Sequence, residues 1–318
     1  MKLSVFSPVL ADMPLSDALA FLRDLGAEQM ELGCGGYPGT AHADINVLSE
    51  SDAEIKKVND AFAQNELTVS ALSVHGNGVH PNKEIAKKAT NELIAAIKTA
   101  RKLGTDKVVT FSGCPGDKTS SCPNWITCAW PNDYSELLEW QWNEVLIPYW
   151  KKIADIADGE GVKICLEMHP GFSVYGVESM LKLRNAVGKA VGANLDPSHL
   201  IWQGVDIPEA VKALGDSIYF FHAKDTAINE AKTKVNGVLD TKSYANILER
   251  SWLFRTVGYG DADFKKTIST LAAVGYTGSI SIEHEDSLMP PKEGLSKAVK
   301  YLKEIIIKDA NTANAWWI

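Results

Sequence analysis

The segment "CLEMHPG" at residues 165–171 decides how the rest of the chain is read. It completes an apolar run, containing Ile164 and Leu166, that has the length and composition of a buried strand. Glu167 and His169 lie two residues apart, so on a strand both side chains point to the same side. A buried strand that ends in a carboxylate and an imidazole aimed the same way indicates a polar site at its end.

Similar apolar runs alternate with helical patterns along the whole chain. The predicted strands are residues 3–8, 29–33, 69–76, 107–113, 162–170, 191–199, 218–225 and 278–286. Strand and helix repeated about eight times are typical of a parallel α/β sheet. The number of repeats, together with the lack of G-x-G-x-x-G after the first strand, favours a closed (β/α)8 TIM barrel over an open doubly wound sheet.

No linker or low-complexity tract divides the chain, so residues 1–318 are predicted to form one barrel domain. The connections at about 114–132 and 226–260, after strands four and seven, are longer than a compact barrel needs. We expect both to overlie the active face.

Composition narrows the classes of partner and compartment. The net charge of −8 and a pI near 5.4 argue against a nucleic-acid partner. No apolar run reaches the roughly 20 residues that span a bilayer, and the N-terminus is too short in its apolar part for a secretory signal. Five cysteines do not make a disulfide framework, which predicts a cytoplasmic protein. The terminal "AWWI" is predicted to pack on a barrel edge or on another subunit, in a homo-oligomer or with a second subunit.

Four consecutive predicted strands end in polar residues, at the end of the barrel where such enzymes place their chemistry. One residue from each strand can converge on a single point: Glu167, Asp196, His222 and Glu283. Alternation places four more on the same inward side: His169, Asn194, Lys224 and Glu285. Three carboxylates and an imidazole need a positive charge among them, and a divalent metal ion supplies it. Oxygen-rich ligation favours Mn²⁺, with Mg²⁺, Co²⁺ and Zn²⁺ as alternatives.

Each of these residues also has a purely structural interpretation. An acidic residue such as Asp196 is commonly a helix N-cap or a loop ion pair. His222 can be a satisfied core histidine, and His199 can bind the loop after Pro197. Four such residues at the same end of four successive strands favour a shared site. Serine-nucleophile and phosphate-loop motifs are absent.

At "LEMHP", "NLDPSH", "FHAKD", "RTVGYGDADF" and "SIEHED" the sequence resembles the xylose-isomerase-like barrel superfamily, in particular its sugar phosphate isomerase/epimerase members. The resemblance covers nearly the whole chain and implies one divalent ion per chain, bound by Glu167, Asp196, His222 and Glu283. It also implies that His199 contacts either a small carbohydrate substrate or a residue that supports the metal ligands, and that Arg255 reaches a substrate oxygen. The histidine of "LEMHP" resembles the metal-bearing subunit of lyases that cleave 3-oxo-glycosides.

Two mechanisms share the same first step. In an isomerase or epimerase, Glu167 and Glu283 act as base and acid on a C–H beside a metal-polarised carbonyl. In the alternative, a lyase, His169 removes the proton and the aglycone leaves by β-elimination. A non-catalytic sugar-binding barrel and an AP-endonuclease-like enzyme stay open as further classes.

Aromatic and polar residues near the same strand ends are candidates for contacting the substrate. Trp125 and Trp130, in the loop after strand four, are predicted to cover a sugar ring. His75 and Glu31, at the ends of strands three and two, are predicted to line the same mouth.

Overall fold

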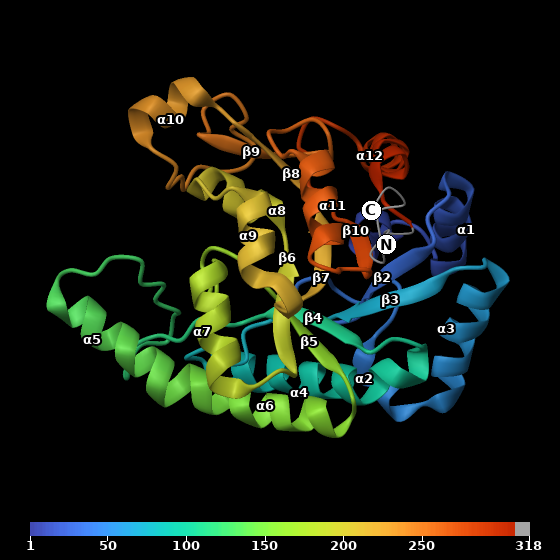
Figure 1. Cartoon of the computed structure of the whole chain (residues 1–318). Helices are drawn as coiled ribbons and strands as arrows, with labels where there is room; N and C mark the ends of the chain where they lie inside the picture. Colours follow the sequence, from blue (N-terminus) through green and yellow to red (C-terminus); the bar gives the residue numbers. More distant parts are fainter. Residues whose placement is uncertain (309–318) are drawn as a thin grey trace, which may run out of the picture.

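The alternating strands and helices close into a barrel. A computed structural model of the chain describes residues 1–308 (Figure 1). Its barrel strands are β1 Lys2–Phe6, β2 Gln29–Gly33, β3 Thr68–Ser73, β4 Lys107–Phe111, β5 Lys163–Glu167, β6 Val191–Leu195, β7 Ile218–Ala223 and β10 Ser279–Ile282. Neighbouring strands pair in parallel, and β10 pairs with β1 to close the cylinder. The predicted (β/α)8 fold class is therefore confirmed.

Helices surround the barrel (Figure 1). They are α1 Leu15–Leu25, α2 Ile45–Glu50, α3 Asp52–Gln64, α4 Lys83–Ala100, α5 Asn132–Trp140, α6 Ile147–Gly159, α7 Val177–Val187, α8 Pro197–Leu200, α9 Ile207–Leu214, α10 Glu230–Asn236, α11 Phe264–Ala273 and α12 Pro291–Ile305. No described helix combines the length and apolar character that crossing a membrane requires. The terminal "AWWI" lies outside the described residues.

Two apolar layers position the polar end of the barrel. The larger core fills the space between strands and helices, as in Ile164 and Leu166 of β5. Inside the barrel lies a smaller cluster of Ala71, Val109, Cys165 and Phe220. Because side chains alternate along a strand, the residues two positions after Cys165 and Phe220 also face inward, one layer closer to the carboxyl end of the strands.

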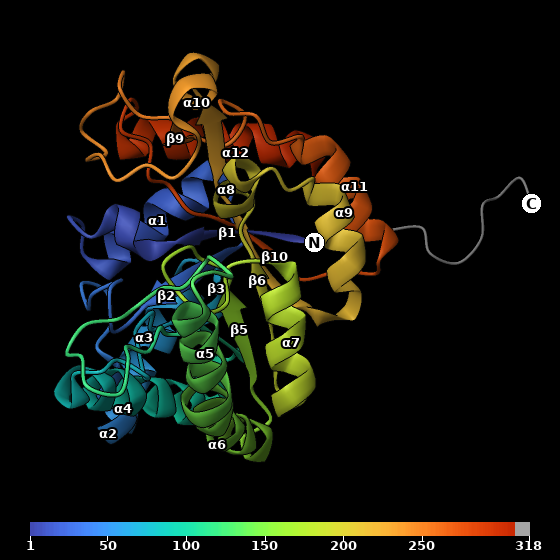
Figure 2. The same cartoon turned by 90° about the vertical axis from the view of Figure 1, so that its left-hand side faces the viewer.

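The two long connections lie after β4 and β7, as predicted. Both project to the left in Figure 1, so both lie on the side that faces the viewer in Figure 2. The second is not a simple loop, which corrects the sequence interpretation. It contains α10 and two short antiparallel strands, β8 Asp225–Ile228 and β9 Trp252–Arg255. Strands of four residues carry too little periodic pattern to be recognised from sequence.

Asp225 fixes the return from this connection. Its Oδ1 accepts backbone N–H groups of Thr226 (2.8 Å) and Ala262 (3.0 Å). Its Oδ2 accepts those of Gly258 (3.0 Å) and Gly260 (2.9 Å). A Cβ on Gly260 would come within 2.3 Å of Asp225 Oδ1, so glycine is required for this close approach. The "FHAKD" and "RTVGYGDADF" segments thus form one structural unit beside the end of β7.

Candidate active site and metal centre

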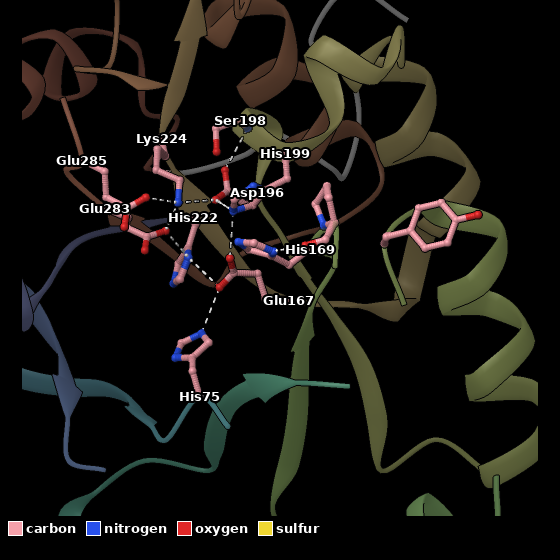
Figure 3. Close-up of polar contacts among 12 residues, drawn as sticks. His75, Glu167, His169, Asp196, Ser198, His199, His222, Lys224, Glu283 and Glu285 are labelled. Atoms are coloured by element: carbon pink, nitrogen blue, oxygen red, sulfur yellow. Dashed lines mark hydrogen bonds and ion pairs between the residues drawn. The ribbon is translucent and has the colours of Figure 1, made fainter. Parts of the chain in front are cut away.

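The inward alternation delivers four potential ligand groups to one point at the barrel mouth (Figure 3). Glu167 ends β5, Asp196 follows β6, His222 lies in β7 and Glu283 follows β10. Each offers one ligand atom, and these atoms all lie within 4.8 Å of one another. Asp196 is also the N-cap of α8, where its Oδ1 accepts the Ser198 N–H at 2.9 Å. Asp196 can therefore cap α8 with Oδ1 and still offer its other carboxylate oxygen to a metal ion.

The geometry around His222 fits a metal ligand. Its Nε2–H donates to Glu31 Oε2 at 2.9 Å, which leaves Nδ1 with a free lone pair when the ring is neutral. Nδ1 lies 3.1 Å from Glu283 Oε2 and 3.4 Å from Glu167 Oε2. Neither contact has hydrogen-bond geometry, and within residues 1–308 this buried nitrogen has no hydrogen-bond partner. Ligands at right angles around an ion at about 2.1 Å lie roughly 3 Å apart, which matches this spacing.

The electrostatics of the cluster also call for a cation. Burial raises the pKa of Asp196 to about 7, and the neighbouring Glu283 and Glu167 add to the effect against the opposing charge of Lys224. Burial by itself would lower the pKa of His222, but Glu31 and Glu283 raise it well above its usual value. The pocket thus stabilises positive charge at the point where the four groups meet.

Lys224 supplies part of that charge. Its Nζ lies 2.8 Å from Glu283 Oε2, 3.1 Å from Glu285 Oε2 and 3.2 Å from Asp196 Oδ2. The whole residue is only 1% exposed. Burial alone would lower the pKa of the ammonium, but Asp196, Glu283 and Glu285 raise it well above its usual value. One ammonium is shared among three carboxylates, two of which also face His222 or His199.

Both oxygens of Glu167 accept hydrogen bonds from histidines. His75 Nε2 lies 2.9 Å from Oε2, and His199 Nε2 lies 3.1 Å from Oε1. Burial would raise the pKa of Glu167, but these two bonds and the nearby His222 lower it well below its usual value. The two histidines therefore hold this carboxylate ionised and fix its orientation.

His169 has a different environment from the other histidines. Its Nδ1–H donates to the Pro170 carbonyl at 2.6 Å, which leaves Nε2 unprotonated in the neutral ring. No described residue donates a hydrogen bond to that Nε2. The ring packs against His199 at 4.0 Å between centroids and against Phe111 at 4.9 Å. Burial lowers the pKa of His169, which favours the neutral form.

A cavity of about 280 Å³, here called the central cavity, opens onto this cluster. Its lining includes His75, Phe111, Glu167, His169, Lys224 and Glu285. Phe6 and Tyr37 contribute apolar surface at the same opening. The volume and the mixed lining suit a monosaccharide-sized ligand, because sugar rings have both apolar C–H faces and hydroxyls.

Several residues predicted to contact substrate lie elsewhere. Glu31 is buried beneath His222 and also accepts hydrogen bonds from Ser73 and Ser281 (2.7 Å for the latter), so it positions the imidazole and does not line the cavity. Arg255 is bound through Nε to Asp286 at 3.1 Å. Trp130 is 77% exposed. Neither Arg255 nor Trp130 lines the central cavity or the cleft beside it, and their contact with a substrate stays a prediction.

His75 and Trp125 are better placed. His75 lines the central cavity, whereas Trp125 lines a neighbouring cleft beyond His169, which also includes His199. Sequence reasoning missed the contacts of Lys224 and Glu285, although their alternation with His222 and Glu283 placed them on the inward side. It also missed Phe111 at the end of β4, because a single apolar residue in a buried strand carries no functional signal.

A closed barrel with three carboxylates and an imidazole at the ends of four successive strands defines a class of proteins. The Xylose isomerase-like TIM barrel family model matches residues 19–305, and the chain belongs to this family, as the sequence resemblance predicted. The chain is 37% identical over 312 residues to the uncharacterized protein YfiH of Bacillus subtilis, covering 96% of this chain and 99% of that protein.

Solved structures share the fold at lower identity. The IOLI protein with a bound zinc atom has a TM-score of 0.68 and 20% identity, covering 96% of this chain and 98% of that one. The apo form of 3-keto-D-glucoside 4-epimerase, YcjR, from E. coli has a TM-score of 0.67 and 14% identity, covering 96% of this chain and 99% of that one.

Proposed function

We propose that the protein is a divalent-metal-dependent isomerase or epimerase that removes the proton beside the carbonyl of a keto-sugar. One observation carries the proposal: an imidazole with a free Nε2, His169, and a buried ammonium, Lys224, line the same cavity as two of the four converging ligand groups. A base, an acid and a cation site around one small cavity are the groups that enolisation of a carbonyl requires.

Glu167, Asp196, His222 and Glu283 would hold the ion, and their three carboxylates and one imidazole favour Mn²⁺ over Mg²⁺, Co²⁺ and Zn²⁺. When bound, a divalent ion polarises a carbonyl and lowers the pKa of the neighbouring C–H. The zinc atom bound by the IOLI protein, which has a similar fold, supports the proposal of a bound divalent metal.

We assign proton abstraction to His169. Its Nε2 carries the lone pair, and the Nδ1–H bond to Pro170 fixes the ring. Glu167 is less suited to be the base, because, despite its burial, the hydrogen bonds from His199 and His75 lower its pKa well below the usual value. In this proposal Glu167 and Glu283 are metal ligands only, and they no longer act as base and acid, as the sequence analysis had predicted.

Lys224 stabilises the charge that develops on the carbonyl oxygen. As His169 takes the proton, the C–H electron pair moves toward the carbonyl oxygen, and the Lys224 ammonium can donate a hydrogen bond to the developing oxyanion. Return of a proton from solvent to the opposite face of the same carbon, with release of the His169 proton to solvent, gives an epimer. Return of the His169 proton to the former carbonyl carbon, with loss of the proton of the neighbouring hydroxyl to solvent, gives an isomer. The 3-keto-D-glucoside 4-epimerase of similar fold supports a keto-sugar as the small-molecule substrate.

Deuterium incorporation tests this assignment. Metal-loaded protein is incubated with methyl 3-oxo-β-D-glucopyranoside in D₂O, and mass spectrometry follows exchange of the proton beside the carbonyl. We expect exchange in the wild type and a loss of about 10²–10⁴-fold in His169→Asn, because the amide keeps the bond to Pro170 but cannot accept the proton. His80→Asn is the matched control, since His80 lines neither cavity near the cluster. Full exchange in His169→Asn would remove His169 as the base.

A lyase that cleaves 3-oxo-glycosides is the second candidate. The observation that favours it is the cleft on the far side of His169, which provides room for a leaving group next to the same base. Release of methanol from the probe, measured in the same reaction, distinguishes elimination from epimerisation. Epimerisation changes the sugar and leaves the methyl group attached.

A further inference from the structure

A second cavity of about 440 Å³, here called the aromatic cleft, shares His169 with the central cavity. One wall comes from Trp125 and Thr127 in the loop after β4. The other comes from Trp202, which follows α8, and from residues 238–254 of the connection after β7. The two long connections of the barrel therefore meet around this cleft, next to the proposed base.

Ring stacking makes the second wall rigid. Trp202 and Trp252 stack with centroids 4.8 Å apart and planes within 4°. Tyr244 and Phe254 stack at 5.4 Å and 18°. The buried guanidinium of Arg250 lies 4.1 Å from the Tyr244 ring and 4.7 Å from the Trp252 ring. A wall of flat rings held by one another is preorganised for a flat ligand.

Phe254 joins the cleft to the catalytic groups. The Lys224 Nζ lies 4.7 Å from its ring centroid, and the His199 ring lies 5.3 Å from it at a steep angle. His169 and His199 both line the cleft as well. Because His169 lines both cavities, a substituent on a sugar bound in the central cavity would enter the cleft beside this ring.

The polar groups of the cleft limit what fits there. Asp240 is already occupied, because it accepts hydrogen bonds from the backbone N–H groups of Ser251 (2.7 Å) and Lys242 (2.9 Å). Trp202 is only 6% exposed, and its indole N–H has no hydrogen-bond partner among residues 1–308; the same holds for the buried indole N–H of Trp125. Both indole rings line the cleft. Buried donors without partners are rare in folded proteins, so a ligand oxygen that reaches either N–H would supply the missing partner.

We propose that the aromatic cleft binds a planar aromatic substituent that carries an oxygen atom and is attached to the keto-sugar. The substrate is thus an aryl glycoside of a keto-sugar. This inference rests on the proposed function, because it takes the sugar to be bound beside His169. A second sugar ring fits less well, since its several hydroxyls would lose water and find few free partners in the cleft.

Two probes test the inference directly. Methyl and 4-hydroxyphenyl 3-oxo-β-D-glucopyranoside are titrated into the metal-loaded protein by calorimetry, and deuterium exchange is measured for both. We expect the aryl probe to bind at least about tenfold more tightly than the methyl probe, because its ring leaves water for an aromatic surface. Tyr244→Ala and Trp125→Ala, one from each wall, should each reduce this ratio toward one.

Trp130→Ala is the matched control, because Trp130 lies on the same loop as Trp125 but is exposed and lines no described cavity at the cleft. It should keep the full ratio. If Tyr244→Ala does not fold, Trp125→Ala still decides, since it belongs to the opposite wall.

The outcomes separate this inference from the proposed function. Equal affinity for the two probes with normal exchange overturns the aryl subsite and leaves the proposed function standing. Tighter aryl binding that depends on Trp125, without exchange of either probe, supports the subsite and contradicts the proposed function. A ratio that survives both wall variants, or no aryl preference at all, overturns the subsite.

Discussion

Replacing Lys224 with methionine tests the charge balance of the cluster. Methionine keeps the apolar stem of the buried lysine but removes the ammonium that lies 2.8 Å from Glu283 and 3.2 Å from Asp196. Removing one partner of a buried ion pair costs about 3–5 kcal/mol, since the remaining charge stays buried. The contact with Glu285 adds little, because that carboxylate is half-exposed. We therefore expect Lys224→Met to lose about 3–5 kcal/mol of unfolding free energy in EDTA.

Urea unfolding with and without excess Mn²⁺ measures both parts of the prediction. Mn²⁺ should raise the urea midpoint of Lys224→Met more than that of the wild type. In the variant the ion replaces the missing positive charge, and no ammonium competes with it for Asp196 and Glu283. Lys212→Met is the control, since Lys212 pairs with Glu209 on the surface, and its midpoint should not change. Equal midpoints for wild type and Lys224→Met in EDTA would refute the reasoning.

Three further perturbations follow from single contacts. Glu31→Gln should weaken Mn²⁺ binding about 10–100-fold by calorimetry, because Glu31 fixes the ring of His222; unchanged affinity would contradict this role. Trp150→Phe should lower the unfolding free energy by about 2 kcal/mol in urea, because it leaves the Ser112 carbonyl without its 2.9 Å donor; no loss would mean that water replaces the indole. Burial lowers the pKa of His42, so the unfolded chain binds more protons as the pH falls below about 6.5 and stability is lost there. His42→Gln should flatten that fall in urea midpoints, and an unchanged profile would exclude His42 as its cause.

The fold was predictable because both of its signals are local. Each barrel strand is an apolar run, and most are followed by a helical pattern, so the number of repeats and the lack of G-x-G-x-x-G favour the closed barrel. The end of the barrel was predictable for the same reason: Glu167, Asp196, His222 and Glu283 interrupt four successive apolar strands, and parallel strands share one carboxyl end. The structure brings their side chains together, and their role as ligands stays a prediction.

Contacts between distant segments were not predictable. Arg255 was assigned to substrate from its place in a motif, but it pairs with Asp286, a residue of the loop after β10. Glu31 was placed at the mouth, yet it lies beneath His222, because the stagger of the strands sets the height of each side chain. Trp125 and Trp130 are tryptophans of the same loop, and the sequence does not distinguish them. The path of the loop leaves Trp130 exposed and partly buries Trp125.

Anomalous diffraction from crystals grown with Mn²⁺ tests the central claim most directly. The account predicts one peak per chain, within about 2.3 Å of ligand atoms from Glu167, Asp196, His222 and Glu283. A peak bound by other residues, or none at this end of the barrel, would contradict it.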